Sequence, residues 1–298
     1  MRSRVYLVAI ALIIALSCMS LISCGDEGPQ HLYIASDSTP GQILQYTLPL
    51  TSSSTPNLAI SFNWGVALAV DSAGNLAAAN NTGSLSIFSA PLSSASTASA
   101  TFNNGTASSS GQILFNHAGD LYAPTQSTTV NVFTHPLTSA STVSQAITTA
   151  GLISAIGAAF DANNNLIVAN DPKTSNLLVF APPYTGAPTV TTPGVAGTAY
   201  RKIALNGTQL FVANVNAGTG TVDVYNLPLT NTSAPAFSMT NVNVPEAVAF
   251  DKSGNLYVGN ANDGTIRVFA PPFAAASTPS LTFTMPAGFN IFGMTIGR

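Results

Sequence analysis

The chain has 298 residues, and only 6% of them are charged, whereas about 25% is usual for a globular domain. Beyond residue 23 the net charge is −5, from six basic and eleven acidic residues, and the basic residues form no run or patch. This excludes nucleic acid as a partner, because binding by counterion release needs clustered lysine and arginine. Serine, threonine, asparagine, glycine and alanine replace the charges, which is typical of an extracytoplasmic surface.

Residues 1–23 have the pattern of an export leader. Arg2 and Arg4 form a positive n-region, and an apolar stretch follows over residues 5–16. Leu21-Ile-Ser-Cys24 then resembles a bacterial lipobox, in which the cysteine is acylated before cleavage. We therefore expect a signal peptide over residues 1–23 and lipidation of Cys24. The alternatives are an uncleaved membrane anchor, because a span of ~20 apolar residues crosses a bilayer, and acylation at Cys18.

Cleavage before Cys24 leaves no other cysteine, so we expect no disulfide and no cysteine-ligated metal. By resemblance to Gram-negative lipoproteins, Gly25 at the next position favours the outer membrane, with the domain facing the periplasm or the exterior. Residues 24–30 are a short lipidated tether. At ~3.4 Å per extended residue, the tether holds residues 31–298 within about 20 Å of the bilayer.

From residue 31 the sequence repeats with a period of about 45 residues. In each period an aromatic residue ends an apolar run, and a proline follows three residues later. The six aromatics are Tyr46, Phe88, Phe133, Phe180, Tyr225 and Phe269. Because stacked repeats need a continuous buried core, we expect these side chains to pack between repeats.

A second repeated feature is a tight turn between two apolar runs. The turns are rich in aspartate, asparagine and glycine and occupy residues 71–75, 116–120, 161–165 and 251–255, with a shorter copy at 206–209. These residue types accept positive φ angles and hydrogen-bond their own backbone, so we interpret Asp71, Asp120, Asp161 and Asp251 as structural. A polar link and another short run complete each period. Four strands, A to D, in ~45 residues are typical of a propeller blade.

The two ends of the chain predict ring closure. Residues 32–36 begin at strand B of a blade that has no strand A of its own, and residues 291–296 supply one extra run after the last strand D. A C-terminal strand A that joins N-terminal strands B to D removes an unpaired blade edge. The sequence therefore predicts an all-β, six-bladed β-propeller with four-stranded blades over residues 31–298.

The segment 248–260, followed by Ile266-Arg-Val-Phe269, resembles an NHL-type repeat. The resemblance covers all six periods and implies the propeller fold. Such propellers include binding scaffolds, and related ones include lactonases and the virginiamycin B lyase, so the fold does not fix the function. The lyase pattern uses histidines with a glutamate near the channel mouth. Here His31, His117 and His135 occupy different repeat positions, so we do not expect histidine catalysis or a zinc site.

One pair of charged residues departs from the repeat. Glu246, the only glutamate within residues 31–298, begins strand A of its blade, and the equivalent position on the neighbouring blade is Arg201. We expect the two side chains to face each other at the mouth of the central channel. A salt bridge that neutralises both is favoured over a ligand clamp, because isolated ion pairs are usually structural.

The residues that end strand B in the repeats are mostly asparagines. We expect Asn80, Asn170, Asn214 and Asn260 to form a polar ring on the face where the B–C and D–A loops emerge. Gluconolactonase-like propellers hold a divalent metal at the axis, and Glu246 with Asn214 or Asn260 would offer oxygen ligands to calcium or magnesium. Few carboxylates lie in register with them, however, and a nearby Arg201 opposes a cation.

The favoured interpretation is a non-enzymatic envelope lipoprotein, held at the membrane by its lipid anchor, that presents a propeller face to a protein or carbohydrate ligand. The alternatives are a metal-dependent lactonase or lyase and a structural surface protein. Converging carboxylates in an axial pocket would favour the enzyme, and a polar face with exposed aromatics would favour binding. A channel plugged by apolar side chains would favour the structural role.

Overall fold

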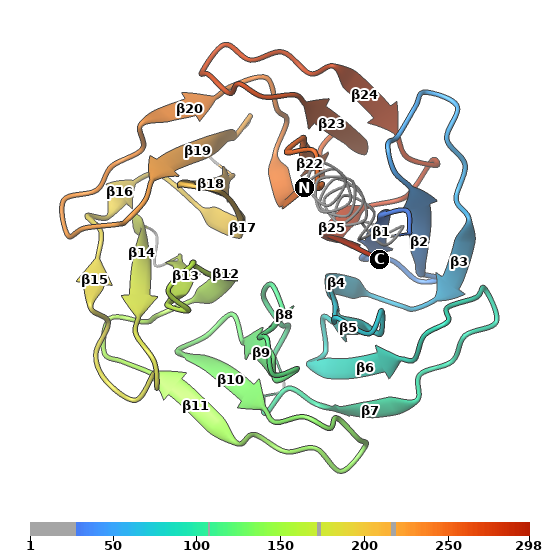
Figure 1. Ribbon diagram of the computed structural model, residues 1–298, viewed down its shortest axis with the longest axis horizontal. Coiled ribbons are helices and arrows are strands. Elements are labelled where there is room, and N and C mark those ends of the chain that lie inside the picture. Colours follow the sequence, from blue (N-terminus) through green and yellow to red (C-terminus); the bar gives the residue numbers. More distant parts are fainter. Residues whose placement is uncertain (1–27, 107, 172–173, 216–218) are drawn as a thin grey trace, which may run out of the picture.

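The computed structural model describes residues 28–106, 108–171, 174–215 and 219–298. These residues form a ring of six β-sheets around a central axis (Figure 1). Each sheet has four main strands, which are consecutive in the chain in all blades but the one that closes the ring, and one sheet carries an additional short strand. The predicted six-bladed propeller is therefore confirmed. No helix in the described part of the chain is long and apolar enough to cross a membrane.

Within each blade the strands run antiparallel, from an inner strand A at the axis to an outer strand D at the rim. Blade 1 contains β25 (Ile291–Gly297), β1 (His31–Ser36), β2 (Gln42–Thr47) and β3 (Leu58–Ser61). Blade 2 contains β4 (Gly65–Val70), β5 (Leu76–Asn80), β6 (Ser84–Phe88) and β7 (Ala100–Asn103). Blade 3 contains β8 (Leu114–Phe115), β9 (Leu121–Pro124), β10 (Thr129–Phe133) and β11 (Gln145–Thr148).

The other three blades follow the same order. Blade 4 contains β12 (Ala155–Phe160), β13 (Leu166–Asn170), β14 (Thr174–Phe180) and β15 (Val190–Thr191), with the additional strand β16 (Val195–Ala196) paired to β14. Blade 5 contains β17 (Tyr200–Asn206), β18 (Gln209–Asn214), β19 (Thr221–Asn226) and β20 (Phe237–Met239). Blade 6 contains β21 (Pro245–Phe250), β22 (Leu256–Asn260), β23 (Thr265–Phe269) and β24 (Leu281–Thr284).

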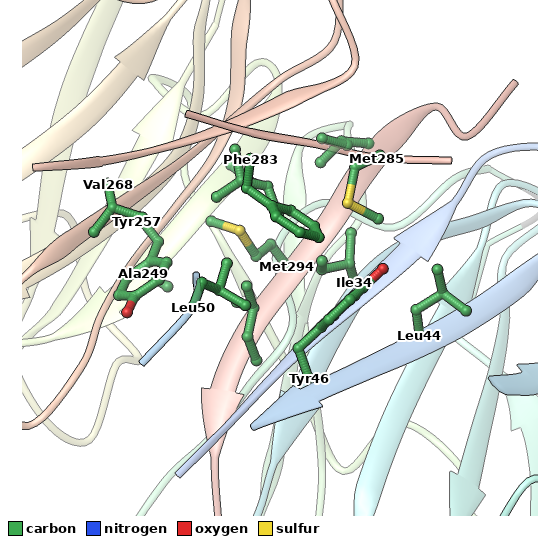
Figure 2. Close-up of a cluster of buried hydrophobic side chains, with 14 residues drawn as sticks. Ile34, Leu44, Tyr46, Leu50, Ala249, Tyr257, Val268, Phe283, Met285 and Met294 are labelled. Carbon is green, nitrogen blue, oxygen red and sulfur yellow. The ribbon is translucent and has the colours of Figure 1, made fainter. Parts of the chain in front are cut away.

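The ring closes through blade 1, as the sequence predicts. The C-terminal β25 pairs antiparallel with the N-terminal β1, from His31 opposite Gly297 to Ser36 opposite Ile291. Figure 1 shows the two strands side by side, in blue and red. Figure 2 shows the apolar seam that this closure buries between blades 6 and 1, where Tyr46 packs edge-on against Phe283 with ring centroids 5.3 Å apart.

The hydrophobic core is divided into six clusters, one at each junction between neighbouring blades. Each of the six repeated aromatics belongs to one of these clusters and is at most 3% exposed. Their predicted packing between blades is therefore confirmed. Burial of this area is what stabilises each blade against the next, because no blade can cover its own apolar faces.

The two ends of the axis carry different connections. We call the end with the A–B turns the turn face, and the end with the B–C and D–A links the loop face. On the turn face the repeated aspartate closes its own turn: Asp71 Oδ1 accepts hydrogen bonds from the Ala73 and Asn75 amides, each at 2.9 Å. Asp161 and Asp251 repeat this arrangement, which confirms the structural role predicted for them.

Candidate functional site

Five charged side chains gather at the loop-face end of the axis, in a chain that has few charges. We call Asp37, Asp171, Arg201, Lys202 and Glu246 the loop-face cluster. Arg201 Nη1 lies 2.9 Å from Asp171 Oδ2, and Arg201 Nε lies 3.4 Å from Glu246 Oε2. These ion pairs connect blades 4, 5 and 6. The structure thus brings together the two residues singled out from the sequence, and Arg201 bridges two carboxylates rather than one.

A β-bulge that recurs at the loop-face end of the inner strands, also in blades 2 and 4, positions these residues. The pairing of β17 with β18 shifts register between Tyr200 and Ile203, and that of β21 with β22 shifts between Pro245 and Ala247. Such bulges occur where a strand must redirect a side chain. At β17 the bulge contains Arg201 and Lys202, and at β21 it contains Glu246.

Lys202 is the most buried cation of the loop-face cluster, with only 7% of the residue exposed. Burial lowers the pKa of Lys202 to about 8, although the Glu246 and Asp37 carboxylates oppose this shift. Burial also raises the pKa of Asp37, which accepts a 3.2 Å hydrogen bond from Asn81 Nδ2. Because Asp37 belongs to blade 1 and Lys202 to blade 5, the cluster reaches across the axis.

The geometry gives a divalent cation no open set of ligands in this cluster. Arg201 already pairs with Asp171 and Glu246, and the positive charge of Lys202 near Glu246 and Asp37 further opposes a cation. Within the described residues, no three His, Cys, Asp or Glu side chains lie close enough together to hold a metal ion. The arrangement favours the salt-bridge interpretation of Glu246 and Arg201 that the sequence suggests.

The asparagines that end strand B use their side chains within their own blades. The Asn80 side-chain Oδ1 accepts hydrogen bonds from the Thr82 and Ser84 backbone amides. The Asn170 side-chain Oδ1 accepts hydrogen bonds from the Ile153 and Ser154 backbone amides. Asn214 donates to Asp223 Oδ2 at 2.8 Å and accepts from the Ala199 amide, and Asn260 accepts from the Asn243 amide. Each amide therefore holds a loop of its own blade, and we find no shared ring of free ligand atoms among them.

Two large apolar side chains are exposed among the described residues, Trp64 at 39% and Ile153 at 55%. Both lie in D–A links of the loop face. The Trp64 carbonyl accepts a hydrogen bond from the Asn81 amide, and the same bond is made by Ser154, Ala199, Val244 and Asn290 in other blades. Trp64 therefore occupies a loop position that several blades share, but only blade 2 has a tryptophan there. The sequence signal for this residue is that Trp64 is the chain's only tryptophan.

The positive φ of Trp64, 58°, costs energy for any residue with a side chain. Val244, at the equivalent position of blade 6, has a φ of 56°, whereas Ser154, Ala199 and Asn290 do not have a positive φ, so blades 2 and 6 share a conformation that the other equivalent links lack. The exposed indole is what distinguishes blade 2. The Trp64 amide also donates to the Ser38 carbonyl at 3.0 Å, which places the residue beside the Asp37 corner of the loop-face cluster.

Gln112 reaches from blade 3 to the inner strands of blades 4 and 5. The Gly111 amide still donates to the Pro124 carbonyl of β9, but the Gln112 amide donates to the Ile156 carbonyl of blade 4, and β8 is only two residues long. Figure 1 shows the segment before β8 reaching toward the centre of the ring. Gln112 Oε1 accepts hydrogen bonds from the Ile203 amide at 2.8 Å and the Ala158 amide at 3.3 Å. Gln112 Nε2 donates to the Ile203 carbonyl at 2.8 Å. One side chain thus ties blade 3 to blades 4 and 5.

Beyond Gln112 the axis contains a cavity of about 530 Å³. Its wall comes from the inner strands of all six blades, and its rim includes Ser72 and His117 of the turn face. Both rim residues are exposed, so the cavity opens on the turn face. No carboxylates converge in it, since Asp71 is the one acidic residue in its described lining and is held by its own turn.

Two other sequence-based expectations concern positions away from the cluster. His31 Nδ1 lies 3.4 Å from Thr47 Oγ1 in blade 1, whereas His117 and His135 belong to blade 3. The three histidines are thus divided between two blades. Cys24, the expected lipidation site, lies outside the described residues.

Comparison with known proteins identifies the fold and no family. No family model matches the chain, and no curated protein matches it. A crystal structure of a nidogen/laminin complex aligns with a TM-score of 0.68 over 90% of this chain and 98% of that chain, at 15% identity. A candidate 6-phosphogluconolactonase from Bacteroides fragilis aligns with a TM-score of 0.64 over 93% and 100%, at 11% identity.

A third similar structure is the WD40 propeller domain of Doa1, with a TM-score of 0.62 over 90% of this chain and 86% of that chain, at 12% identity. At such identities the likeness shows the propeller fold alone. The neighbours include a protein in complex and a candidate enzyme, so they do not choose between binding and catalysis.

Proposed function

We propose that this protein is a non-enzymatic binding scaffold of the cell envelope, and that its loop face recognises a protein or carbohydrate ligand. The observation that carries the proposal is the position of Trp64 and Ile153. The two large exposed apolar side chains of the described residues both project from the loop face, around the loop-face cluster. An exposed aromatic beside fixed charges is typical of a recognition surface, where aromatic anchors supply most of the binding energy.

The rest of the loop face supports recognition better than catalysis. Its asparagine amides and carboxylates are already hydrogen-bonded or ion-paired, so they stabilise a rigid surface. A rigid scaffold that carries variable links is what a binding propeller needs. The resemblance of the repeat to NHL-type propellers, which include binding scaffolds, agrees with this proposal.

The expected lipid anchor would orient the molecule. Gln30 lies on the turn face, where its Oε1 accepts a 2.7 Å hydrogen bond from the Lys252 amide. A tether that joins Cys24 to Gln30 would therefore leave from the turn face. In an outer-membrane lipoprotein, the turn face would lie toward the bilayer and the loop face would point away from it, open to a partner.

The test is a screen of the full-length protein against glycan and peptide arrays, followed by affinity measurements on each array ligand. We expect Trp64→Ala to weaken binding by about 2 kcal/mol or more, as loss of an aromatic anchor does. The matched control is Lys252→Ala on the turn face, which should bind normally. Lys252→Ala should keep the wild-type melting temperature, because exposed side chains contribute within about ±0.5 kcal/mol to stability. Binding by Trp64→Ala is measured well below its own melting transition, because the indole is only 39% exposed and its truncation also removes packing. Ligands that bind Trp64→Ala and Ile153→Ser as tightly as wild type would contradict the proposal.

A further inference from the structure

The axial cavity opens on the face opposite to Trp64 and takes no part in the proposed function. Its volume of about 530 Å³ falls within the ~300–1,000 Å³ that is usual for small-molecule sites. Small side chains recur at one position of the inner strands that line it. Four of the six blades have alanine there, and these are Ala69, Ala159, Ala204 and Ala249.

The wall of this cavity is a set of unpaired strand edges. In all six blades the inner strand pairs with a single neighbour, so its other edge faces the axis. Along such an edge, alternate residues direct both their N–H and their C=O outward. A ligand in the cavity therefore meets backbone donors and acceptors at regular intervals, and these groups gain from being satisfied.

Gln112 shows which chemical group this wall binds. Its carboxamide lies on the free edges of β12 and β17, where it accepts from the Ala158 and Ile203 amides and donates to the Ile203 carbonyl. Two residues farther along the same strands, Phe160 and Leu205 present the same edge to the cavity. The contacts that hold the Gln112 carboxamide are thus repeated one step deeper into the cavity.

The side chains around the cavity favour an uncharged ligand. The wall includes Ile113, Val248 and Met294, and its one carboxylate, Asp71, accepts three hydrogen bonds within its own turn. No described lysine or arginine lines the cavity. A charged ligand would lose its hydration without gaining a counter-charge, which costs several kcal/mol.

We propose that the axial cavity binds a small neutral molecule that combines a carboxamide or peptide group with an apolar ring or chain. The amide hydrogen-bonds to the inner-strand edges next to Gln112, and the apolar part lies against the side chains of the wall. The site is open to the medium through the turn face and is separate from the loop-face surface.

The experiment measures binding of N-acetylphenylalaninamide to the full-length protein in lipid nanodiscs by isothermal titration calorimetry, with empty nanodiscs as the blank. N-acetylphenylalanine, which has the same ring and a carboxylate, is the charged analogue. Thr295→Trp fills the cavity, and Thr282→Trp places the same residue on an exposed outer strand as the matched control. If Thr295→Trp shows no cooperative melting transition, Ala204→Leu, which fills part of the cavity, replaces it.

We expect saturable binding of the amide at one site, weakened by about tenfold or more in Thr295→Trp or Ala204→Leu, and unchanged in Thr282→Trp. The charged analogue should bind at least about tenfold more weakly than the amide. Absence of saturable amide binding, equal binding in the cavity-filling variants, or equal binding of the charged analogue would overturn the proposal. None of these results bears on Trp64, so the loop-face proposal stands or falls separately.

Discussion

The two ends of the central axis are built from the same repeat in different ways. On the turn face four of the six blades use an aspartate or asparagine at the same position to close the same turn, and these are Asp71, Asn116, Asp161 and Asp251. On the loop face the equivalent positions differ from blade to blade, and Arg201, Glu246 and Trp64 each occur once. Residues that follow the repeat hydrogen-bond to the backbone of their own turn. Residues that depart from the repeat either connect two blades or are exposed to solvent, and we propose that these residues form the recognition surface.

The largest effect is expected where an irregular segment crosses the axis. A Cβ added at Gly111 would lie 2.2 Å from the Ile156 carbonyl oxygen, so Gly111→Ala must displace the segment that carries Gln112. We expect a loss near the upper end of the ~1–3 kcal/mol usual for overpacking. Chemical denaturation of Gly111→Ala and of Gly151→Ala, which has open space around its Cβ, measures the difference. Equal stabilities would show that the crossing segment is not fixed.

The second prediction concerns the buried ammonium of Lys202. Its pKa falls from an ordinary value of 10.5 to about 8 in the folded state. As the pH rises from 8 to 10.5 the folded protein loses this proton while the unfolded chain keeps it, so folding gains stability over that window. The gain is about 2–3 kcal/mol, at 1.4 kcal/mol per unit of pKa.

Lys202→Met lacks this proton and provides the reference. The free energy of unfolding of wild type minus that of Lys202→Met should rise from pH 8 to pH 10.5, and should be flat below pH 7. Tyrosine ionisation affects both proteins and cancels in the difference. A difference that is constant across the whole range would mean that Lys202 titrates normally.

The third prediction tests the regular turns. Asp251→Ala removes the acceptor of the Ser253 and Asn255 amides, and we expect a loss of about 1–2 kcal/mol for the unmet hydrogen bonds. Lys252→Ala, one residue away and exposed, should change stability by less than about 0.5 kcal/mol. Thermal unfolding of the two variants measures both effects. Similar losses in the two would show that the Asp251 hydrogen bonds do not stabilise the turn.

The smallest expected effect is that of divalent cations. Because Arg201 already pairs with Glu246, calcium or magnesium should leave the melting temperature of wild type and of Glu246→Gln unchanged. A rise in wild type that Glu246→Gln abolishes would instead establish a metal at the axis and favour the lactonase-like alternative.

The fold could be predicted because the sequence pattern of a blade recurs six times. The aromatics at Tyr46 and its equivalents, the turn aspartates, and the unmatched strand at residues 291–296 gave the blades and their closure. The pairing of Glu246 with Arg201 also emerged from aligning the repeats, since neighbouring blades place equivalent residues side by side.

Contacts across the axis could not be predicted in the same way. Gln112 reaches blades 4 and 5 because its segment leaves the ladder, and alignment of repeats assumes that it stays. Lys202 interacts with Asp37 two blades away, which no nearest-neighbour argument finds. The asparagines resembled ligands because their residue type suits both roles, and only their hydrogen bonds show that they hold loops.

The most direct test of the central claim is hydrogen–deuterium exchange of the full-length protein with and without an array-identified ligand. We predict protection in the loop-face links that contain Trp64 and Ile153, with no change in the turn-face segments 71–75 and 251–255. Protection confined to the turn-face segments would contradict the claim that the irregular loop face is the recognition surface.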